Sequence, residues 1–405
     1  MKFVTLLITL NLLVISASPV SCKSSVTPVP AVGITSPEEV GMSTEKLQQL
    51  AGMVQGWIKE GEMKGASYVI MRNGRLVARE VFGNASDNQP ASPVTGDTIF
   101  GILSLSKIVF GTAVMVAIDR GQLSTQDTVG GVLPDFAGTN KADITMEQLL
   151  TLSSGMGLLP DLQQIGILVP KRASEEEWRQ VVRDAPLGFQ PGTGVEYSPS
   201  FNSNLLKWML EKKTGMEIEA FCQKYIFQPL GMKDTTYRPS REVWLRIATL
   251  YSSSPAQAQL ANSEYARTQL TAVWGSLFTT PADLAKLLQA YLNGGELNKY
   301  RLLSPEMVAL GTRSHTDSLP LRTGAPGDMG YHFRVKGTRV LVDNFGDLTS
   351  PGTFGFGGAN ATWAWVDPDK GLVVVFLSNT VATGTQRVER LRAFNDGVVK
   401  AIVSE

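Results

Sequence analysis

Between residues 43 and 60, apolar side chains recur at the spacing of an α-helix. They are Leu47, Leu50, Val54, Trp57 and Ile58. This pattern predicts an amphipathic helix with one buried face. Apolar runs follow at residues 66–71 and 75–82, and the Asn73-Gly74 pair between them supplies the positive φ angles that a tight hairpin requires. The first part of the chain is therefore expected to form a helix and two paired strands.

The C-terminal part of the chain repeats this pattern in mirror order. Apolar runs at residues 362–366 and 371–377 flank a turn at residues 367–370, and residues 387–403 carry the spacing of a closing helix. Two hairpins, each accompanied by a helix, can bury their apolar faces together. We expect both ends of the chain to build one antiparallel sheet flanked by helices.

The middle of the chain has helical periodicity instead. It predicts helices at residues 105–120, 145–153, 203–213 and 281–293. The last of these starts with Pro281, and Thr280 is placed to cap it. The expected fold is α/β of the α+β type, with a sheet subdomain at about 36–103 and 245–403 and an inserted all-helical subdomain at about 104–244.

The first 22 residues read as an export signal. Lys2 precedes an apolar run at residues 3–15, which is shorter than the roughly 20 residues that span a bilayer. Small residues then lead to Cys22 and resemble a lipoprotein signal, although Pro19 stands where an aliphatic residue is usual. Two outcomes stay open: lipidation of Cys22, or ordinary cleavage near Ala17 or Ser21.

Residues 23–35, rich in Ser, Pro and Val, are expected to be a tether to a folded domain at residues 36–400. The protein is therefore expected to be exported, to the periplasm or the cell exterior. Membrane attachment is expected only through a lipidated Cys22.

The overall composition limits the kinds of binding partner and cofactor that we expect. With 37 basic and 37 acidic residues the formal net charge is zero, so no global field favours nucleic acid. The chain has two histidines, His315 and His332, and two cysteines, Cys22 and Cys222. These are too few to favour a metal cluster or a disulfide framework. We expect no metal, no cofactor and a small-molecule ester, amide or peptide as partner.

Two Ser-x-x-Lys patterns occur, at residues 43–46 and 104–107, and residues three apart share a helix face. Lys46 opens an amphipathic helix with a solvent face. Lys107 is followed by a run at residues 108–118 that is apolar nearly all round, so it is expected to be buried. Burial disfavours a charged ammonium, which suits a general base. The alternative for Lys107 is a cation at a helix start that reaches to solvent.

Further landmarks accompany the second pattern in order along the chain. They include Thr98-Ile99-Phe100, Asp127-Thr128-Val129, Ser154-Gly155, Tyr197-Ser198, Pro229-Leu230-Gly231-Met232, Asn293-Gly294-Gly295, Gly355-Phe356-Gly357-Gly358 and Ser378-Asn379. With them the chain resembles the serine β-lactamase and penicillin-binding-protein superfamily, which includes β-lactamase-fold esterases. The resemblance covers almost the whole mature length and implies the DD-peptidase/β-lactamase-like transpeptidase fold.

The resemblance also assigns catalytic roles. It implies that Ser104 is the acylated nucleophile and that Lys107 and Tyr197 act as its general base. The backbone N–H groups of Ser104 and Ala359 would form the oxyanion hole. Pro199 stands where the family most often has Asn, so Asn202 or Asn204 is a candidate for the missing substrate-binding amide.

Residues 356–358, which we call the third motif, lie where the family usually has Lys-Thr-Gly or His-x-Gly. Phe356 cannot pair with a carboxylate, and we expect it to present an apolar wall favouring short neutral esters. Gly357 and Gly358 would let substrate approach the strand. His332 is read as structural.

The leading interpretation is a serine hydrolase, most simply a carboxylesterase or small-amide hydrolase. The alternatives are a β-lactamase or D-alanyl-D-alanine carboxypeptidase, and a catalytically weak protein that binds cell wall or another partner. A Ser-His-Asp hydrolase is disfavoured because no Gly-x-Ser-x-Gly occurs.

Overall fold

The computed structural model describes residues 34–404, apart from residues 88–90, 269–271, 323, 338, 340–343 and 383. The export signal, Cys22 and nearly all of the tether lie outside the described residues, so they stay sequence predictions. None of the described helices is long and apolar enough to cross a membrane.

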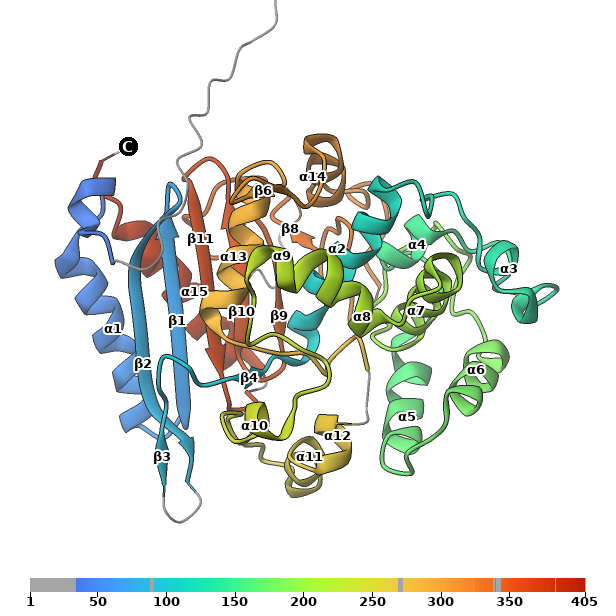
Figure 1. The fold of residues 1–405 in the computed structure, drawn as a ribbon, viewed down its shortest axis with the longest axis horizontal. Coiled ribbons are helices and arrows are strands. Elements are labelled where there is room, and N and C mark those ends of the chain that lie inside the picture. The colour runs from blue at the N-terminus through green and yellow to red at the C-terminus, as the bar shows by residue number, and fades with distance from the viewer. Residues whose placement is uncertain are drawn as a thin grey trace, which may run out of the picture.

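A seven-stranded sheet in the order β3-β2-β1-β11-β10-β9-β8 forms the centre of the molecule (Figure 1). Its strands are β1 (Gly65–Arg72), β2 (Arg75–Ser86), β3 (Ser92–Pro93), β8 (Arg334–Val335), β9 (Phe354–Gly358), β10 (Thr362–Asp367) and β11 (Leu372–Ser378). All neighbours pair antiparallel. Strand β1 pairs with β11, Val69 opposite Val375, which confirms that the two ends of the chain share one sheet.

Both faces of the sheet are buried. Side chains of successive strand residues point to opposite sides, so one strand can contribute to two separate core clusters. In β11, Val373 and Val375 belong to one core cluster, whereas Val374 and Phe376 belong to the other. Helices α2 (Ser106–Asp119) and α13 (Pro281–Leu292) contribute to the first cluster. Helices α1 (Thr44–Lys59) and α15 (Gly384–Lys400) cover the second (Figure 1).

The turn and helix-capping residues predicted from the sequence take up these roles in the structure. Asn73 and Gly74 have φ angles of 50° and 76°, as the hairpin between β1 and β2 requires. The Ser43 side chain accepts a hydrogen bond from the N–H of Lys46 and caps α1. Thr280 caps α13 in the same way. These features confirm the predicted first helix, hairpin and fourth middle helix.

Some boundaries differ from the prediction. The closing helix α15 begins and ends three residues earlier than residues 387–403. The helix expected at residues 145–153 is only α4 (Met146–Leu150), because Leu152 has a positive φ of 59° and turns the chain out of the helix. A 3₁₀ turn, η2 (Leu103–Leu105), precedes α2.

From Leu103 to Trp244 the described chain contributes helices and turns but no strand of the large sheet. After α2 these are α3 (Val129–Val132), η3 (Pro134–Phe136), α4, α5 (Leu158–Leu168), α6 (Glu175–Asp184), α7 (Phe201–Thr214), α8 (Ile218–Cys222), a π-helical turn η4 (Gln223–Phe227), α9 (Gln228–Leu230) and α10 (Arg241–Trp244).

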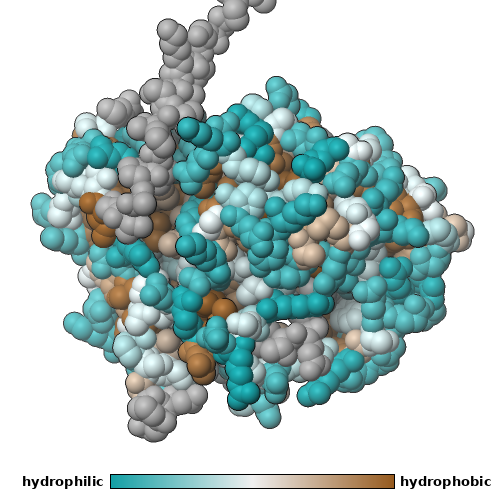
Figure 2. All heavy atoms as spheres, viewed as in Figure 1, coloured by the Kyte–Doolittle hydropathy of each residue, from teal (hydrophilic) through white to brown (hydrophobic). Residues whose placement is uncertain are grey.

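The remaining elements are short. They are η1 (Pro37–Val40), α11 (Pro255–Ala261), α12 (Glu264–Thr268), α14 (Pro305–Thr312), the strand pair β4 (Phe100–Gly101) with β5 (Phe278–Thr279), and the pair β6 (Glu296–Leu297) with β7 (Tyr300–Arg301). The surface facing the viewer in Figure 2 is largely hydrophilic, with scattered hydrophobic groups.

A buried polar pair fastens α15 to the sheet and gives a test of this packing. The indole N–H of Trp365 donates to Asn395 Oδ1 at 2.7 Å, and Asn395 Nδ2 donates to the Asn344 carbonyl at 2.6 Å. Asn395→Leu leaves both groups without a partner, so the free energy of unfolding should fall by about 1–3 kcal/mol in urea denaturation. The exposed Glu389→Ala on the same helix should change it by less than about 0.5 kcal/mol. Equal losses in the two variants would contradict this account.

Candidate active site

Ser104 lies in the 3₁₀ turn η2 that leads directly into α2. The residue before it, Leu103, has a φ of 46°, a conformation that is strained for a residue with a side chain. The turn is held in place because the N–H of Ile102 donates to the Leu277 carbonyl at 3.0 Å. Ser104 itself is half-buried. Its hydroxyl is thus presented from a fixed, strained turn.

Tyr197 and Lys107 both reach this turn. The Tyr197 hydroxyl donates a hydrogen bond to Ser104 Oγ at 2.8 Å. Lys107 is completely buried, and its Nζ lies 5.0 Å from the centre of the Tyr197 ring. The structure therefore brings together the three residues that the sequence singled out as nucleophile and base.

Lys107 is held without a carboxylate. Its Nζ donates to the Trp274 carbonyl at 3.1 Å, and the described residues supply no ion pair for it. His332 lies close by: a Cβ added at Gly111, one helical turn beyond Lys107, would come within 2.6 Å of His332 Cβ. Burial first, and the Lys107 charge second, lower the pKa of His332 to about 3. At neutral pH the ring beside Lys107 is therefore uncharged.

Asp161, on α5, anchors the segment that carries Tyr197. Its carboxylate accepts hydrogen bonds from Ser198 Oγ at 2.6 Å and from the N–H groups of Ser200 and Phe201, both at 2.9 Å. Ser200 Oγ donates to it as well. Asp161 is fully buried, and removal from water raises its pKa although these donors oppose the shift. Ser198, Ser200 and Phe201, which lie just after Tyr197 in the chain, are thus all hydrogen-bonded to one buried side chain.

The third motif forms the end of β9 beside the Ser104 turn. A Cβ at Gly358 would lie 2.4 Å from the Ile102 carbonyl oxygen, so only glycine permits this close approach. Asn360 Nδ2 donates to the Gly101 carbonyl at 2.8 Å and to the Ser378 carbonyl at 2.7 Å. These contacts fasten the strand next to the nucleophile. Ala359 lines the same two cavities as Ser104, so the proposed oxyanion-hole pair is adjacent to one space.

Asn202 takes a different place from the one expected. Its side chain is fully buried, and its Oδ1 accepts a hydrogen bond from Ser154 Oγ at 2.5 Å. It is not among the described residues that line either cavity at Ser104. Helix α7 begins at Phe201 and turns Asn202 inward, so its expected contact with substrate is wrong in this structure.

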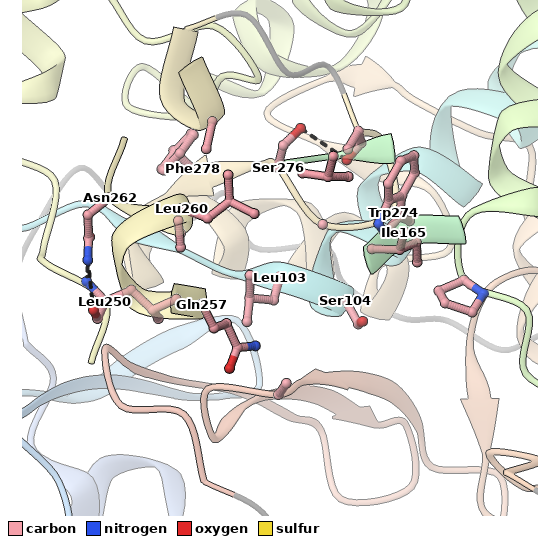
Figure 3. A pocket seen from close by; sticks show the side chains of 18 of the residues that line it. Leu103, Ser104, Ile165, Leu250, Gln257, Leu260, Asn262, Trp274, Ser276 and Phe278 are labelled. Atoms are coloured by element: carbon pink, nitrogen blue, oxygen red, sulfur yellow. Dashed lines mark hydrogen bonds between the residues drawn. The ribbon is translucent and has the colours of Figure 1, made fainter. Parts of the chain in front are cut away.

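A cavity of about 430 Å³ opens on one side of Ser104 (Figure 3). Its walls are mainly aliphatic and aromatic, and they include Leu103, Ile165, Ile247, Leu260, Trp274 and Phe278. Ile165 comes from α5 and Leu260 from α11. The volume lies in the range of small-molecule sites. We call this space the apolar cavity.

A smaller cavity of about 220 Å³ lies on the side of the third motif. Phe356, Gly357 and Gly358 line it, but so do Arg334 of β8 and Arg387 of α15. We call it the arginine cavity. The expectation that Phe356 gives this side an apolar wall is therefore incomplete, because other elements supply two guanidinium groups.

Arg387 reaches the site from the closing helix. Its Nη2 donates to the Gly358 carbonyl at 2.9 Å, and it has no ion pair among the described residues. Burial lowers the pKa of Arg387, while its attraction to Tyr197 opposes that shift. No group of three His, Cys, Asp or Glu side chains in the described chain is arranged to hold a metal ion.

Arg334, Arg387, Asp161 and Trp274 are the residues of the site that sequence reasoning missed. None belongs to a local pattern that marks chemistry. An arginine in a closing helix and an aspartate in a helix usually face water, and only the folded chain shows that Arg387 is half-buried beside Ser104 and that Asp161 is fully buried.

Comparison with known proteins identifies the family. The family model "Beta-lactamase" matches residues 48–396, so the chain belongs to the Beta-lactamase family. A relative from Escherichia coli (strain K12), named "Putative D-alanyl-D-alanine carboxypeptidase", is 23% identical over 402 residues, covering 91% of this chain and 90% of the relative.

Two solved structures share the fold. One is described as a family VIII carboxylesterase, with a TM-score of 0.71, 21% identity, and coverage of 89% of this chain and 98% of that one. The other is EstCE1, described as a hydrolase with promiscuous acyltransferase activity, with a TM-score of 0.71, 22% identity, and coverage of 87% and 98%. These likenesses show the fold.

The anchoring of Tyr197 can be tested at Asp161. Asp161→Ala removes the acceptor for four donors and frees the Tyr197 segment, so kcat for a nitrophenyl ester should fall by about 10²-fold, the usual result of a small misplacement. Asp161→Asn keeps one acceptor oxygen for these donors and should retain more activity than the alanine variant. Gln163→Ala, exposed on the same helix, serves as the control. Wild-type kcat in a folded Asp161→Ala protein would refute the anchoring role.

Proposed function

We propose that this protein is a carboxylesterase or small-amide hydrolase that works through an acyl-enzyme at Ser104. Tyr197, with Lys107, takes the Ser104 proton, and Oγ attacks the acyl carbon. The N–H groups of Ser104 and Ala359 stabilise the oxyanion. The leaving group departs with the proton, and water then attacks the acyl-enzyme, releases the acid and restores the Ser104 hydroxyl.

The observation that carries this proposal is the apolar cavity beside the Ser104 and Tyr197 pair. A space of about 430 Å³ with aliphatic and aromatic walls suits the hydrocarbon part of an ester or amide. The likeness in fold to a structure described as a carboxylesterase is consistent with it. The hydrogen bond from Tyr197 to Ser104 argues against a protein that only binds cell wall or a partner, because a binding role needs no such pair.

A D-alanyl-D-alanine carboxypeptidase or β-lactamase is the second candidate, and the arginine cavity favours it. Substrates of both activities carry a carboxylate, which guanidinium groups bind by charge-assisted hydrogen bonds. Arg334 and Arg387 offer such groups where Phe356 cannot. The name of the Escherichia coli relative points in the same direction.

The nucleophile is tested by substitution and labelling. Ser104→Ala should abolish turnover of nitrophenyl acetate and covalent labelling by a fluorophosphonate, because no acyl-enzyme can form. Comparing initial rates on this ester, on nitrocefin and on a D-alanyl-D-alanine peptide then separates the two candidates. Ser43→Ala is the matched control, since that Ser-x-x-Lys serine only caps α1. Labelling that persists in Ser104→Ala would show that another residue is the nucleophile.

The base is tested by a double-mutant cycle. Lys107→Ala and Tyr197→Phe should each lower kcat by about 10²-fold or more, the scale for losing a general base. Because the two groups move one proton together, the double variant should lose little beyond the worse single variant. Losses that multiply in the double variant would instead show that the two residues act independently.

A further inference from the structure

The two cavities meet at the reacting atoms. Ser104, Tyr197 and Ala359 line both of them, so a bond cleaved at Ser104 lies at the boundary between the two spaces. The two halves of a substrate must therefore enter different surroundings. What the walls offer on each side specifies the chemistry of each half.

On one side the walls exclude charge. The apolar cavity is lined by side chains such as Ile165, Ile247, Leu260 and Phe278, and its few polar residues are neutral. Burying an ionised group there would carry a large desolvation cost. Binding of a hydrocarbon chain, in contrast, becomes more favourable with each methylene that is buried. This side selects an apolar group of several carbons.

On the other side the walls attract an anion. Arg334 and Arg387 line the arginine cavity, and none of the described residues that line either cavity is acidic. The Arg334 guanidinium lies 5.5 Å from the centre of the Trp363 ring, and Arg387 is held by the Gly358 carbonyl. A planar carboxylate matches the donor geometry of such guanidinium groups.

We propose that the substrate is an amphiphile, an ester or amide in which an apolar acyl chain is joined to a leaving group that bears a carboxylate. This inference rests on the proposed hydrolase function and narrows its substrate. The acyl chain occupies the apolar cavity, because a hydrocarbon chain is stabilised by contact with apolar walls and this cavity is the larger of the two. The carboxylate of the leaving group occupies the arginine cavity. N-acyl amino acids and O-acyl hydroxy acids belong to this chemical class.

The reaction balances without a further reactant. Ser104 Oγ forms a bond to the acyl carbon, and the bond from that carbon to the leaving oxygen or nitrogen breaks. The leaving group takes up the proton that Tyr197 and Lys107 removed from Ser104. Water then adds to the acyl carbon, its proton returns to Ser104 Oγ, and the carboxylic acid is released.

The experiment uses four esters that combine two acyl groups, acetyl and octanoyl, with two leaving groups, nitrophenol and carboxynitrophenol. For the wild type, kcat/KM should be highest for the octanoyl ester of carboxynitrophenol. Each feature alone should raise kcat/KM by about tenfold or more, the scale of one or two well-made contacts. Ratios within one enzyme remove differences in expression and folding.

Matched variants assign each preference to its cavity. Ala261→Phe fills part of the apolar cavity and should lower the octanoyl to acetyl ratio by about tenfold, while Ala256→Phe, exposed on the same helix, should not change it. Arg387→Gln should lower the carboxynitrophenyl to nitrophenyl ratio by about tenfold, and Arg390→Gln, one turn away and paired with Glu62, should not. Arg334→Gln is the second variant, should Arg387→Gln fail to fold.

The outcomes separate this inference from the proposed function. Hydrolysis of all four esters through Ser104 with flat ratios, or ratios that the cavity variants leave unchanged, would overturn the amphiphile and leave the hydrolase standing. A carboxylate preference that Ala261→Phe alters and the arginine variants do not would show the reverse orientation and also overturn the assignment. Absence of turnover and of fluorophosphonate labelling would instead defeat the hydrolase itself.

Discussion

The hydrogen bond from the Tyr197 hydroxyl to Ser104 Oγ joins two segments that lie 93 residues apart in the chain. At 2.8 Å it tolerates little displacement of either backbone. On the nucleophile side the strained Leu103 and the bond from Ile102 to Leu277 hold the turn. On the tyrosine side the constraint comes from buried Asp161. Two independent sets of contacts therefore fix the two ends of this hydrogen bond. The conformational entropy of both segments is lost when the chain folds, so it need not be lost again when the reaction takes place.

Besides the Ser104 turn and the Tyr197 segment, the large sheet also borders the site. The register of its strands fixes the position of Ala359. Strand β9 pairs with β10, and β10 with β11, so the third motif is positioned through strands from the C-terminal half. Gly358 lets β9 approach the Ile102 carbonyl, and Asn360 bridges from there to β11 at Ser378. Because β1 pairs with β11, both ends of the chain take part in placing Ala359, the residue proposed for the oxyanion hole, next to the cavities at Ser104.

What could be predicted from the sequence follows from short-range physics. The apolar runs of the strands, the Asn73-Gly74 turn and the cap at Thr280 act within a few residues, and they identified β1, β2, β10, β11 and helix α13 correctly. Ser104, Lys107 and Tyr197 were found by motif and resemblance. Asp161 and Arg387 were missed because tertiary packing alone buries Asp161 and brings the half-buried Arg387 to the cavity at Ser104. The sequence offered Asn202 as a substitute for the amide missing at Pro199 but could not show that α7 begins at Phe201 and turns the Asn202 side chain toward Ser154.

The two histidines show why the chemistry at Ser104 depends on a lysine and a tyrosine. His315 Nε2–H donates to the Leu310 carbonyl, its Nδ1 lies near the Glu147 carboxylate, and its ring stacks on Tyr331, so it is engaged elsewhere. His332 is buried against α2, and its pKa of about 3 keeps it neutral at physiological pH. Neither imidazole is a hydrogen-bond partner of Ser104 in the described structure, whereas the Tyr197 phenol is. The Tyr197 hydroxyl is therefore the group in direct hydrogen-bond contact with Ser104 Oγ, and the proposed mechanism uses it as the proton acceptor. Lys107 Nζ lies 5.0 Å from the centre of that ring and has no carboxylate partner in the described chain, which is why the proposed mechanism pairs these two residues.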